Sequence, residues 1–247
     1  GIVLVTGPTG SGKTTTLYSS LKRIATDEVN VSTIEDPIEM VEDAFNQTQV
    51  QHNIGLDFAA GIRTLMRQDP DIIMVGEIRD IETAEMAIQA SLTGHLVLST
   101  LHTNDAPQTL NRLVQMGIPP FNIVSSVILI MAQRLARRLC EHCKKDAEFP
   151  DNILLSAGFK KDELANLKVY SPVGCDHCVD GYKGRVGLFQ VMPVSEDIRR
   201  LILNGGDTMQ LAEQAEKENV NDLRQSGLEK VRQGITSLEE IDRVTRE

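Results

Sequence analysis

The residues with the most specific chemistry are 7–14, which read GPTGSGKT. They have the complete G-x-x-x-x-G-K-[ST] spacing of a phosphate-binding loop, between a predicted strand at residues 2–5 and a predicted helix at residues 14–25. Glycines let backbone N–H groups turn inward around an anion, and the helix N-terminus adds its positive end. We expect Lys13 to reach phosphate oxygens and the Thr14 hydroxyl to ligate Mg²⁺.

The predicted nucleotide contacts cover the loop and the start of the helix. ATP and Mg²⁺ are the cofactors expected here. The Lys13 ammonium can bind β- and γ-phosphate oxygens, and the Thr14 hydroxyl can ligate the metal that bridges them. A glycine-rich turn with a coincidental lysine is the competing interpretation, and the flanking elements argue against it. The predicted set is Gly7, Pro8, Thr9, Gly10, Ser11, Gly12, Lys13, Thr14 and Thr15.

A second apolar strand, residues 72–75, is followed by Gly76 and Glu77. The strand is typical of a Walker B element, but Gly76 stands where an aspartate on the metal side is usual. Glu77 must then carry the charge. At the carboxyl end of a strand beside the loop strand, it is placed to hold Mg²⁺ through water. The alternative is a solvated glutamate that begins a helix.

Residues 33–39 read TIEDPIE and place three carboxylates after another apolar strand. Clustered negative charge is costly unless a cation or a proton offsets it. Pro37 ends the strand and stiffens the turn, which helps to aim a general base at a water held against a γ-phosphate. An acidic surface turn would have the same spacing.

Two histidines flank the strand predicted at residues 96–100, within GHLVLSTLHTN. His102 follows the carboxyl end of the strand, which is the ligand side of a parallel sheet, and could donate to a γ-phosphate oxygen. For His95, at the other end, a structural role is favoured.

All four cysteines form two C-x-x-C pairs, the spacing of structural zinc sites: Cys140, Cys143, Cys175 and Cys178. We expect one Zn²⁺ held by four thiolates, with residues 150–172 looping outward between the pairs. His142 and His177, inside the pairs, are expected to face solvent. Reduced thiols without metal are the main alternative.

Alternating apolar strands and helical patterns over the first 105 residues predict an α/β fold with a mostly parallel sheet. Further helices are expected from Asn104 to Gly117, and from Pro120 to about Leu139 with a basic C-terminal end. Residues 140–187 look irregular. From Ser195 the pattern predicts three or four short helices, with Ser237 and Glu240 as a capping box. The expected domains are 1–139, a cysteine-bearing segment 140–190 and a helical region 191–247.

The net charge of −10 disfavours nucleic acid as a partner, and no apolar run approaches the length of a membrane span. We therefore expect a soluble protein that can dock on a membrane. The chain begins directly in an apolar strand at Gly1, as expected of a piece of a longer protein.

Four blocks in fixed order, GPTGSGKT, TIEDPIE, IIMVGEIRD and GHLVLSTLHTN, resemble the Walker A, Asp box, atypical Walker B and His box of the secretion-type hexameric ATPases. These proteins power type II secretion and type IV pili. RQDPDIIMVGEIRD, STLHTNDAPQTLNRLV, AQRLARRLC and CDHCVDGYKGRVGLFQVMP are more similar to the pilus-assembly branch than to the type II secretion branch. Cysteine pairs of this kind, typically absent from retraction ATPases of pili, also favour assembly.

The resemblance implies a RecA-like P-loop core and an ATP hydrolase. It implies that Lys13 and Thr14 bind phosphate and Mg²⁺, Glu39 acts as general base with Glu35 in reserve, Glu77 organises Mg²⁺ and water, and His102 senses the γ-phosphate. Members of the family also carry a preceding domain whose arginines reach a neighbour's nucleotide.

The partners implied by the family are further copies in a homo-hexamer and an inner-membrane platform protein, contacted from the cytoplasmic side. ATP turnover would then drive pilin polymerisation. Type II secretion is the alternative within the class. A nucleotide-gated docking module is disfavoured because a pure binder needs neither a poised base nor Glu77, and a DNA-working motor is disfavoured by the acidic charge.

Overall fold

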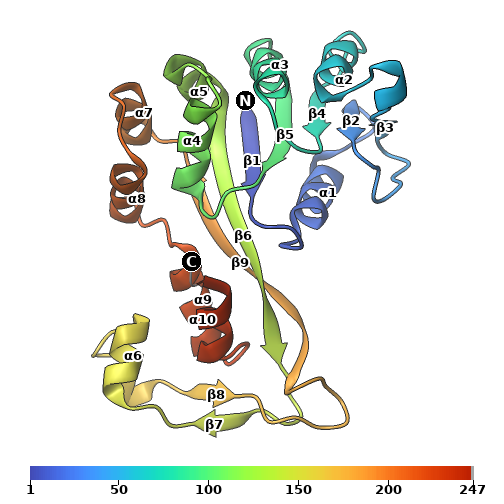
Figure 1. Ribbon diagram of the computed structural model, residues 1–247. Coiled ribbons are helices and arrows are strands. Elements are labelled where there is room, and N and C mark those ends of the chain that lie inside the picture. Colours follow the sequence, from blue (N-terminus) through green and yellow to red (C-terminus); the bar gives the residue numbers. More distant parts are fainter. Residues whose placement is uncertain (246–247) are drawn as a thin grey trace. The chain divides into compact units, whose positions relative to one another are not determined.

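The computed structural model of the protein describes residues 1–245, which form a seven-stranded sheet flanked by helices and a separate two-stranded sheet (Figure 1). In the large sheet β1 pairs in parallel with β5 and β6, β4 with β2 and β5, and β2 with β3. The predicted α/β fold with a mostly parallel sheet is confirmed. The strands run in the order β3 (Asn46–Gln49), β2 (Val31–Glu35), β4 (Ile72–Val75), β5 (Leu96–Leu101), β1 (Ile2–Thr6), β6 (Val127–Leu139) and β9 (Tyr182–Pro193).

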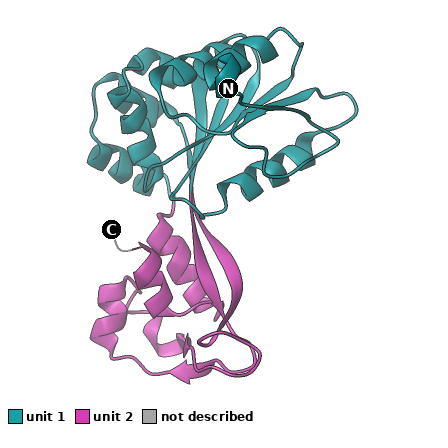
Figure 2. Ribbon diagram, turned by 45° about the vertical axis from the view of Figure 1, so that its right-hand side comes forward, with its two compact units in different colours: residues 1–132, 191–220 teal, residues 133–190, 221–247 magenta. Residues whose placement is uncertain are grey.

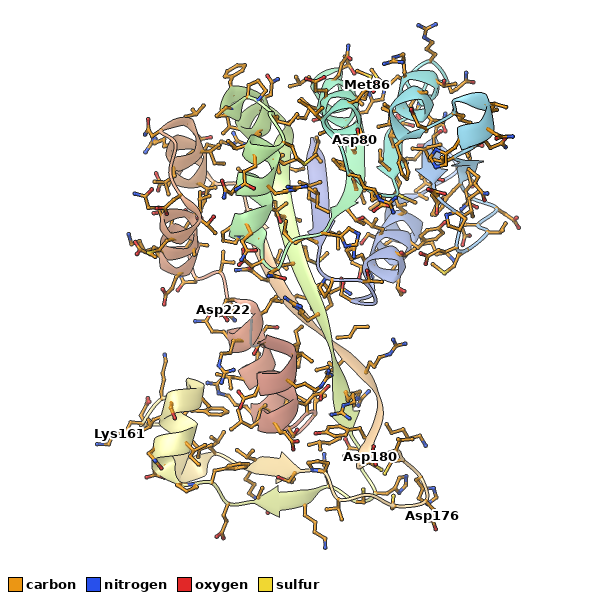
Figure 3. The ribbon with its side chains drawn as sticks, viewed as in Figure 1. Asp80, Met86, Lys161, Asp176, Asp180 and Asp222 are labelled. Carbon is orange, nitrogen blue, oxygen red and sulfur yellow. The ribbon has the colours of Figure 1, made fainter. Side chains whose placement is uncertain are left out.

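Three helices of this part begin after an aspartate that caps the helix N-terminus. Asp57, Asp80 and Asp105 each accept a hydrogen bond from a backbone N–H in the first turn, which satisfies a donor that has no partner inside the helix. Figure 3 labels Asp80 at the start of α3. The helices are α1 (Lys13–Ile24), α2 (Phe58–Leu65), α3 (Ile81–Leu92), α4 (Ala106–Gln115), α5 (Pro120–Ser126), α7 (Glu196–Leu203) and α8 (Thr208–Lys217), with a 3-10 turn at His52–Ile54.

Helices cover both faces of the sheet because its central strands are apolar on both sides. Leu17 and Leu21 of α1 pack in a buried cluster with Val31 of β2 and with side chains of β1, β4 and β5. Ile34, three residues further along β2, points to the other face and packs against α2. A Cβ at Gly61 of α2 would lie 2.7 Å from Ile34 Cγ1, so only glycine permits this approach.

Within the described residues the chain divides into two compact units, shown in teal and magenta in Figure 2. Unit 1 contains residues 1–132 and 191–220, and unit 2 contains residues 133–190 and the chain from 221. The expected helical region is therefore shared, with α7 and α8 in unit 1 and α9 and α10 in unit 2. A functional division at residues 139 and 190 stays a prediction.

The predicted helix from Pro120 to Leu139 is wrong beyond Ser126. α5 ends there, and residues 127–139 form β6, whose Ile130 and Ala132 are fully buried beside β1. Pairing along β1 and burial on both faces outweigh the helical character of the sequence. The basic residues expected at a helix end, among them Arg137, lie on this strand instead.

Unit 2 is more regular than the sequence indicates. A hairpin of β7 (Lys145–Ala147) and β8 (Val169–Ser171) encloses α6 (Asp151–Ala157) and a 3-10 turn at Leu164–Asn166. α9 (Leu223–Arg232) and α10 (Leu238–Thr245) complete the unit. Across both units α7 to α10 confirm the prediction of short helices after Ser195, with Gly205 and Gly234 in left-handed conformations beyond α7 and α9.

A buried carboxylate joins the elements of unit 2. Glu240 of α10 is 0% exposed and accepts hydrogen bonds from the backbone N–H and guanidinium of Arg137 (2.7–2.9 Å) and from Arg243 (2.6 and 2.8 Å). Burial acts to raise the pKa of Glu240, but the hydrogen bonds from Arg243 and Arg137 outweigh it and lower the pKa to about 2. The Ser237 hydroxyl accepts a hydrogen bond from the Glu240 N–H, as expected of an N-cap. The Glu240 side chain binds Arg137 and Arg243.

In the part of the chain that the structure describes, each helix is too short or too polar to traverse a lipid bilayer.

Replacing Glu240 by Gln should lower the free energy of unfolding by ~3 kcal/mol, because two guanidinium groups lose their shared anion. Its exposed neighbour provides the matched control: Glu239→Gln should change the free energy by less than ~0.5 kcal/mol. Denaturant unfolding measures both.

The sign of the pH dependence follows from the lowered pKa. The contribution of Glu240 is present above its ordinary value of 4.5 and is lost as the pH falls toward 2. The difference between the two variants should therefore be constant between about pH 6 and 8. Equal stability of the two variants would contradict the role of Glu240.

Candidate active site and cysteine cluster

The phosphate-binding loop lies between β1 and α1, as predicted. β1 ends at Thr6 and α1 begins at Lys13, with Gly12 as its N-cap at φ 87°. Gly10 has φ 78°, and this left-handed conformation is strained for residues with a Cβ. The Lys13 ammonium donates to the carbonyls of Gly7 (2.9 Å) and Pro8 (3.1 Å). The lysine therefore folds back over its own loop.

Two carboxylates from other strands reach the surroundings of Lys13. Burial lowers the pKa of Lys13, while the negative charges of Glu77 and Glu39 act to raise it. Glu77 follows β4 and Glu39 follows β2, so the fold brings together three predicted site residues that are far apart in the sequence. The expectation that the strand before Glu77 lies beside the loop strand is wrong, because β5 lies between β4 and β1. The cause is the parallel sheet, whose strands end at one edge.

Glu77 is largely enclosed, with a side chain that is 12% exposed, whereas Glu39 is exposed. One carboxylate oxygen pairs with Arg79, and the other lies 3.5 Å from Nε2 of His102. The structure thus brings His102 to Glu77. A carboxylate that holds cationic or hydrogen-bonding side chains on both oxygens has a defined orientation.

Two threonines, Thr100 and Thr6, fix the backbone on both sides of Glu77 and His102. The Thr100 hydroxyl donates to the Gly76 carbonyl (2.8 Å), and the Ile78 N–H donates to the Thr100 carbonyl (2.9 Å). Thr6 acts similarly on the residues around His102: its hydroxyl donates to the Leu101 carbonyl (3.0 Å) and accepts from the Thr103 N–H (2.9 Å). These bonds tie the ends of β1, β4 and β5 together.

Gly76 packs directly against the end of β2. Its N–H donates to the Ile34 carbonyl (2.9 Å), and an added Cβ would already touch Phe58 Cε1 at 3.4 Å and Glu35 Cα at 3.5 Å. These are ordinary van der Waals distances, so the space around Gly76 does not explain why glycine stands where an aspartate is usual.

The carboxylates of TIEDPIE have different surroundings. Glu35 is 3% exposed and accepts hydrogen bonds from the hydroxyls of Tyr18 (2.6 Å) and Thr33 (2.7 Å). Glu39 is exposed in the loop that follows β2. The sequence alone does not separate these two glutamates, whereas burial does.

His95 lies at the start of β5, at the edge opposite to the loop. Its Nδ1 is 2.8 Å from the Ala90 carbonyl and 3.1 Å from the Thr93 hydroxyl. These contacts fasten the turn between α3 and β5 and agree with the structural role that was favoured.

The four cysteines of unit 2 form one cluster, with all sulfur atoms within 4.8 Å of one another. Neighbouring Sγ atoms are 3.7–3.9 Å apart. Four sulfurs arranged tetrahedrally at the usual Zn–S length would be about 3.8 Å apart. These separations are far longer than a disulfide bond, so the cysteines are free thiols in a geometry that fits Zn²⁺.

Backbone N–H groups support the sulfur atoms. The Gly174 N–H donates to Cys143 Sγ and the Cys175 N–H to Cys178 Sγ, both at 3.3 Å. Such outer bonds orient metal ligands. His142 and His177 are exposed, as predicted, and their rings contact each other with centroids 4.5 Å apart. Figure 3 labels Asp176 and Asp180, which flank Cys178 in the loop before β9.

Sequence reasoning missed several residues of the site. Arg79 lies within IIMVGEIRD, two positions after Glu77. The opposite charges of these two neighbours are the signal in the sequence that could have indicated their ion pair. Thr6, Thr100 and Tyr18 have no local signal. Their hydrogen-bond partners belong to strands whose adjacency the sequence does not reveal.

A phosphate-binding loop on a parallel sheet, with carboxylates after neighbouring strands, defines the class of P-loop nucleotide-binding proteins. The family model described as "Type II/IV secretion system protein" matches residues 1–243. The chain belongs to this family.

Relatives in the family include both expected branches. Over its full length the chain is 56% identical to the type IV pilus assembly ATPase PilB of Pseudomonas aeruginosa, and it covers 44% of that protein. It is 49% identical to the type II secretion system ATPase E of Vibrio cholerae, again over its full length, and covers 49% of that protein. The chain therefore spans less than half the length of these relatives.

Solved structures share the fold over nearly the entire chain. The pilus retraction motor PilT with bound ADP matches 98% of this chain and 60% of its own, with a TM-score of 0.72 and 30% identity. The ATPase DotB of Legionella pneumophila matches 98% of this chain and 59% of its own, with a TM-score of 0.70 and 29% identity.

Proposed function

We propose that this chain binds ATP with Mg²⁺ and hydrolyses it. The observation that carries the proposal is the parallel sheet, which brings the loop after β1 and the segments that carry Glu77 and Glu39 to one edge. The negative charges of both glutamates act to raise the pKa of Lys13. Phosphoryl transfer requires this combination of a cationic loop, a metal-side carboxylate and a base. The relationship to ATPases of the family supports it.

The donors present fit Mg²⁺, because Thr14 at the start of α1 and Glu77 after β4 offer oxygen ligands on the loop side of the sheet. When bound, Mg²⁺ would neutralise charge that develops between the β- and γ-phosphates. Lys13 leaves the loop carbonyls for phosphate oxygens, and the backbone of residues 7–15 surrounds the phosphates. Glu77 orients water through its fixed carboxylate.

Glu39 is the proposed general base. An exposed carboxylate near Lys13 can accept a proton from the attacking water, whereas Glu35 is buried and holds the hydroxyl donors of Tyr18 and Thr33. His102, beside Glu77, donates to a γ-phosphate oxygen and so senses whether ATP or ADP is bound. Arg79 holds Glu77 from the other side.

We propose that, in the cell, ATP turnover powers pilin polymerisation in type IV pilus assembly. The support is 56% identity to a pilus assembly ATPase, against 49% for a type II secretion ATPase, which is the alternative. As part of that proposal the protein forms a homo-hexamer and acts on an inner-membrane platform protein. It is cytoplasmic and peripheral to the membrane, and no nucleic acid is involved.

We propose that the four cysteines hold one structural Zn²⁺. Their sulfur separations fit tetrahedral coordination, and Zn²⁺ would join the turn after β6 to the loop before β9 within unit 2. All four ligands come from the protein, which is typical of structural and not catalytic zinc.

Replacing Lys13 by Ala should abolish ATP binding and turnover without unfolding, because its charge serves the ligand. Fluorescent ATP titration, phosphate release and circular dichroism measure the three properties. Unchanged affinity and turnover in a folded variant would remove the P-loop assignment.

In cells the same variant should lose surface pili and keep type II secretion. Loss of type II secretion with normal pili would instead support the type II secretion alternative.

Replacing Glu39 by Gln should leave MgATP bound but slow hydrolysis by ~10²-fold or more in the native full-length protein. The substitution removes the general base and leaves the contacts with the phosphates in place. Single-turnover phosphate release measures the effect. If Glu35→Gln slows a chemical step while Glu39→Gln remains fully active, the choice of base is wrong.

The purified protein should contain one zinc per chain, measured by elemental analysis of reduced, chelator-free samples. Cys175→Ser should lower both zinc content and thermal stability, since metal binding and folding of unit 2 are linked. A matched exchange outside the ligand set, Ser171→Ala, should leave the zinc content unchanged. Zinc-free wild-type protein of full stability would refute the site.

A further inference from the structure

The loop that carries Glu39, residues 36–45, is fastened at several points, among them Met40, which follows Glu39, and Glu42, whose N–H donates to Gln47 Oε1 (2.8 Å). The Met40 carbonyl lies 3.0 Å from the Tyr18 hydroxyl and accepts a hydrogen bond from the Gln47 side-chain amide (2.9 Å). Tyr18 belongs to α1, the helix that begins with Lys13, and Gln47 belongs to β3. We call residues 36–45 the carboxylate loop. Its middle is thus bound to the edge strand through Gln47 and contacts the phosphate-binding helix at Tyr18.

The Glu35 carboxylate holds both of these anchoring side chains. It accepts from the Tyr18 hydroxyl at 2.6 Å and from the Gln47 amide at 3.2 Å, and the Gln47 amide also donates to the Tyr18 hydroxyl at 2.8 Å. Tyr18 is 2% exposed and Glu35 3%, so the bonds are shielded from water. Buried charge-assisted hydrogen bonds define geometry more firmly than exposed ones.

The tyrosine is held in its donor state. Burial raises the pKa of Tyr18, and the hydrogen bond and charge of Glu35 raise it further. Its ring also packs against Phe45 at the end of the loop, with centroids 5.8 Å apart. The loop is therefore fixed to α1 at its middle and at its end, and Glu39 immediately precedes the middle point.

We propose that Tyr18, Glu35 and Gln47 form an anchor that positions the carboxylate loop, and with it Glu39, against the phosphate-binding helix. These are positioning residues, and Glu35 acts through the loop and not on water. The proposal rests on the proposed hydrolysis with Glu39 as base. A displacement of a catalytic group by about 1 Å can reduce turnover 10²-fold, so loss of the anchor affects chemistry more than binding.

Two variants loosen the anchor without touching the phosphate contacts. Tyr18→Phe keeps the ring against Phe45 but removes the hydroxyl, and Gln47→Met removes the amide from the half-buried edge strand. Each should lower kcat about tenfold or more and leave KM for ATP within about twofold. Steady-state phosphate release in the native full-length protein measures both constants. If Tyr18→Phe does not fold, Gln47→Met carries the test.

Thr33→Val is the matched control. The Thr33 hydroxyl donates to the same Glu35 carboxylate at 2.7 Å but lies on β2, so its loss costs a buried hydrogen bond while the ties to Met40 remain. The control should lower Tm about as much as Tyr18→Phe and keep kcat within about twofold. Equal losses of kcat in both variants would show a general stability effect and overturn the proposal.

A double-variant cycle with Glu39→Gln separates this inference from the proposed function. If the anchor acts through Glu39, adding Tyr18→Phe to Glu39→Gln should reduce kcat by less than about twofold further. A full additional loss, or normal kcat in both anchor variants, overturns the anchor while Glu39 remains the base. Wild-type turnover in Glu39→Gln alone overturns the base, and the anchor with it.

Discussion

The candidate site depends on the parallel hydrogen bonding of β1, β2, β4 and β5. Parallel strands end at the same edge, so the segments that follow them meet there, although they are separated in sequence by as much as the distance from Gly7 to His102. The pairing of β4 with β2 and β5 places Glu77 between the loop and the carboxylates of β2. Each functional segment therefore lies within a few residues of the strand end that places it at this edge.

The edge is made rigid by polar side chains that are buried beside it. Thr6 and Thr100 bind backbone on both sides of His102 and Glu77, and Glu35 gathers donors from α1 and β3. Desolvation makes these bonds strong and their loss costly. The side chains that face the ligand side, such as Glu39 and Lys13, are more exposed and can exchange partners. A fixed inner layer and an adaptable outer layer suit a site that must bind and release a charged ligand.

Unit 2 is held by a different kind of constraint. Besides its apolar core, a buried anion between two arginines and a cysteine cluster join segments that are distant in sequence. Both devices draw together the end of β6, the loop before β9 and the C-terminal helices. A small unit gains stability from such cross-links.

The sequence by itself determined the local features: the phosphate-binding loop, the strand before it, the helix after it and the cysteine pairs. Backbone conformation and residue type within a few positions decide these, so motif and periodicity predict them. Tertiary structure decided the rest. Residues 127–139 form a strand because β1 offers hydrogen bonds along its side. The Glu240 side chain does not complete the capping box, because Arg137 of β6 lies close enough to donate hydrogen bonds to it. Glu35 and Glu39 have the same side chain, and only the tertiary structure buries Glu35 against donors from α1 and β3 while it leaves Glu39 exposed. Such distinctions depend on which segments become neighbours, and that is a property of the folded chain.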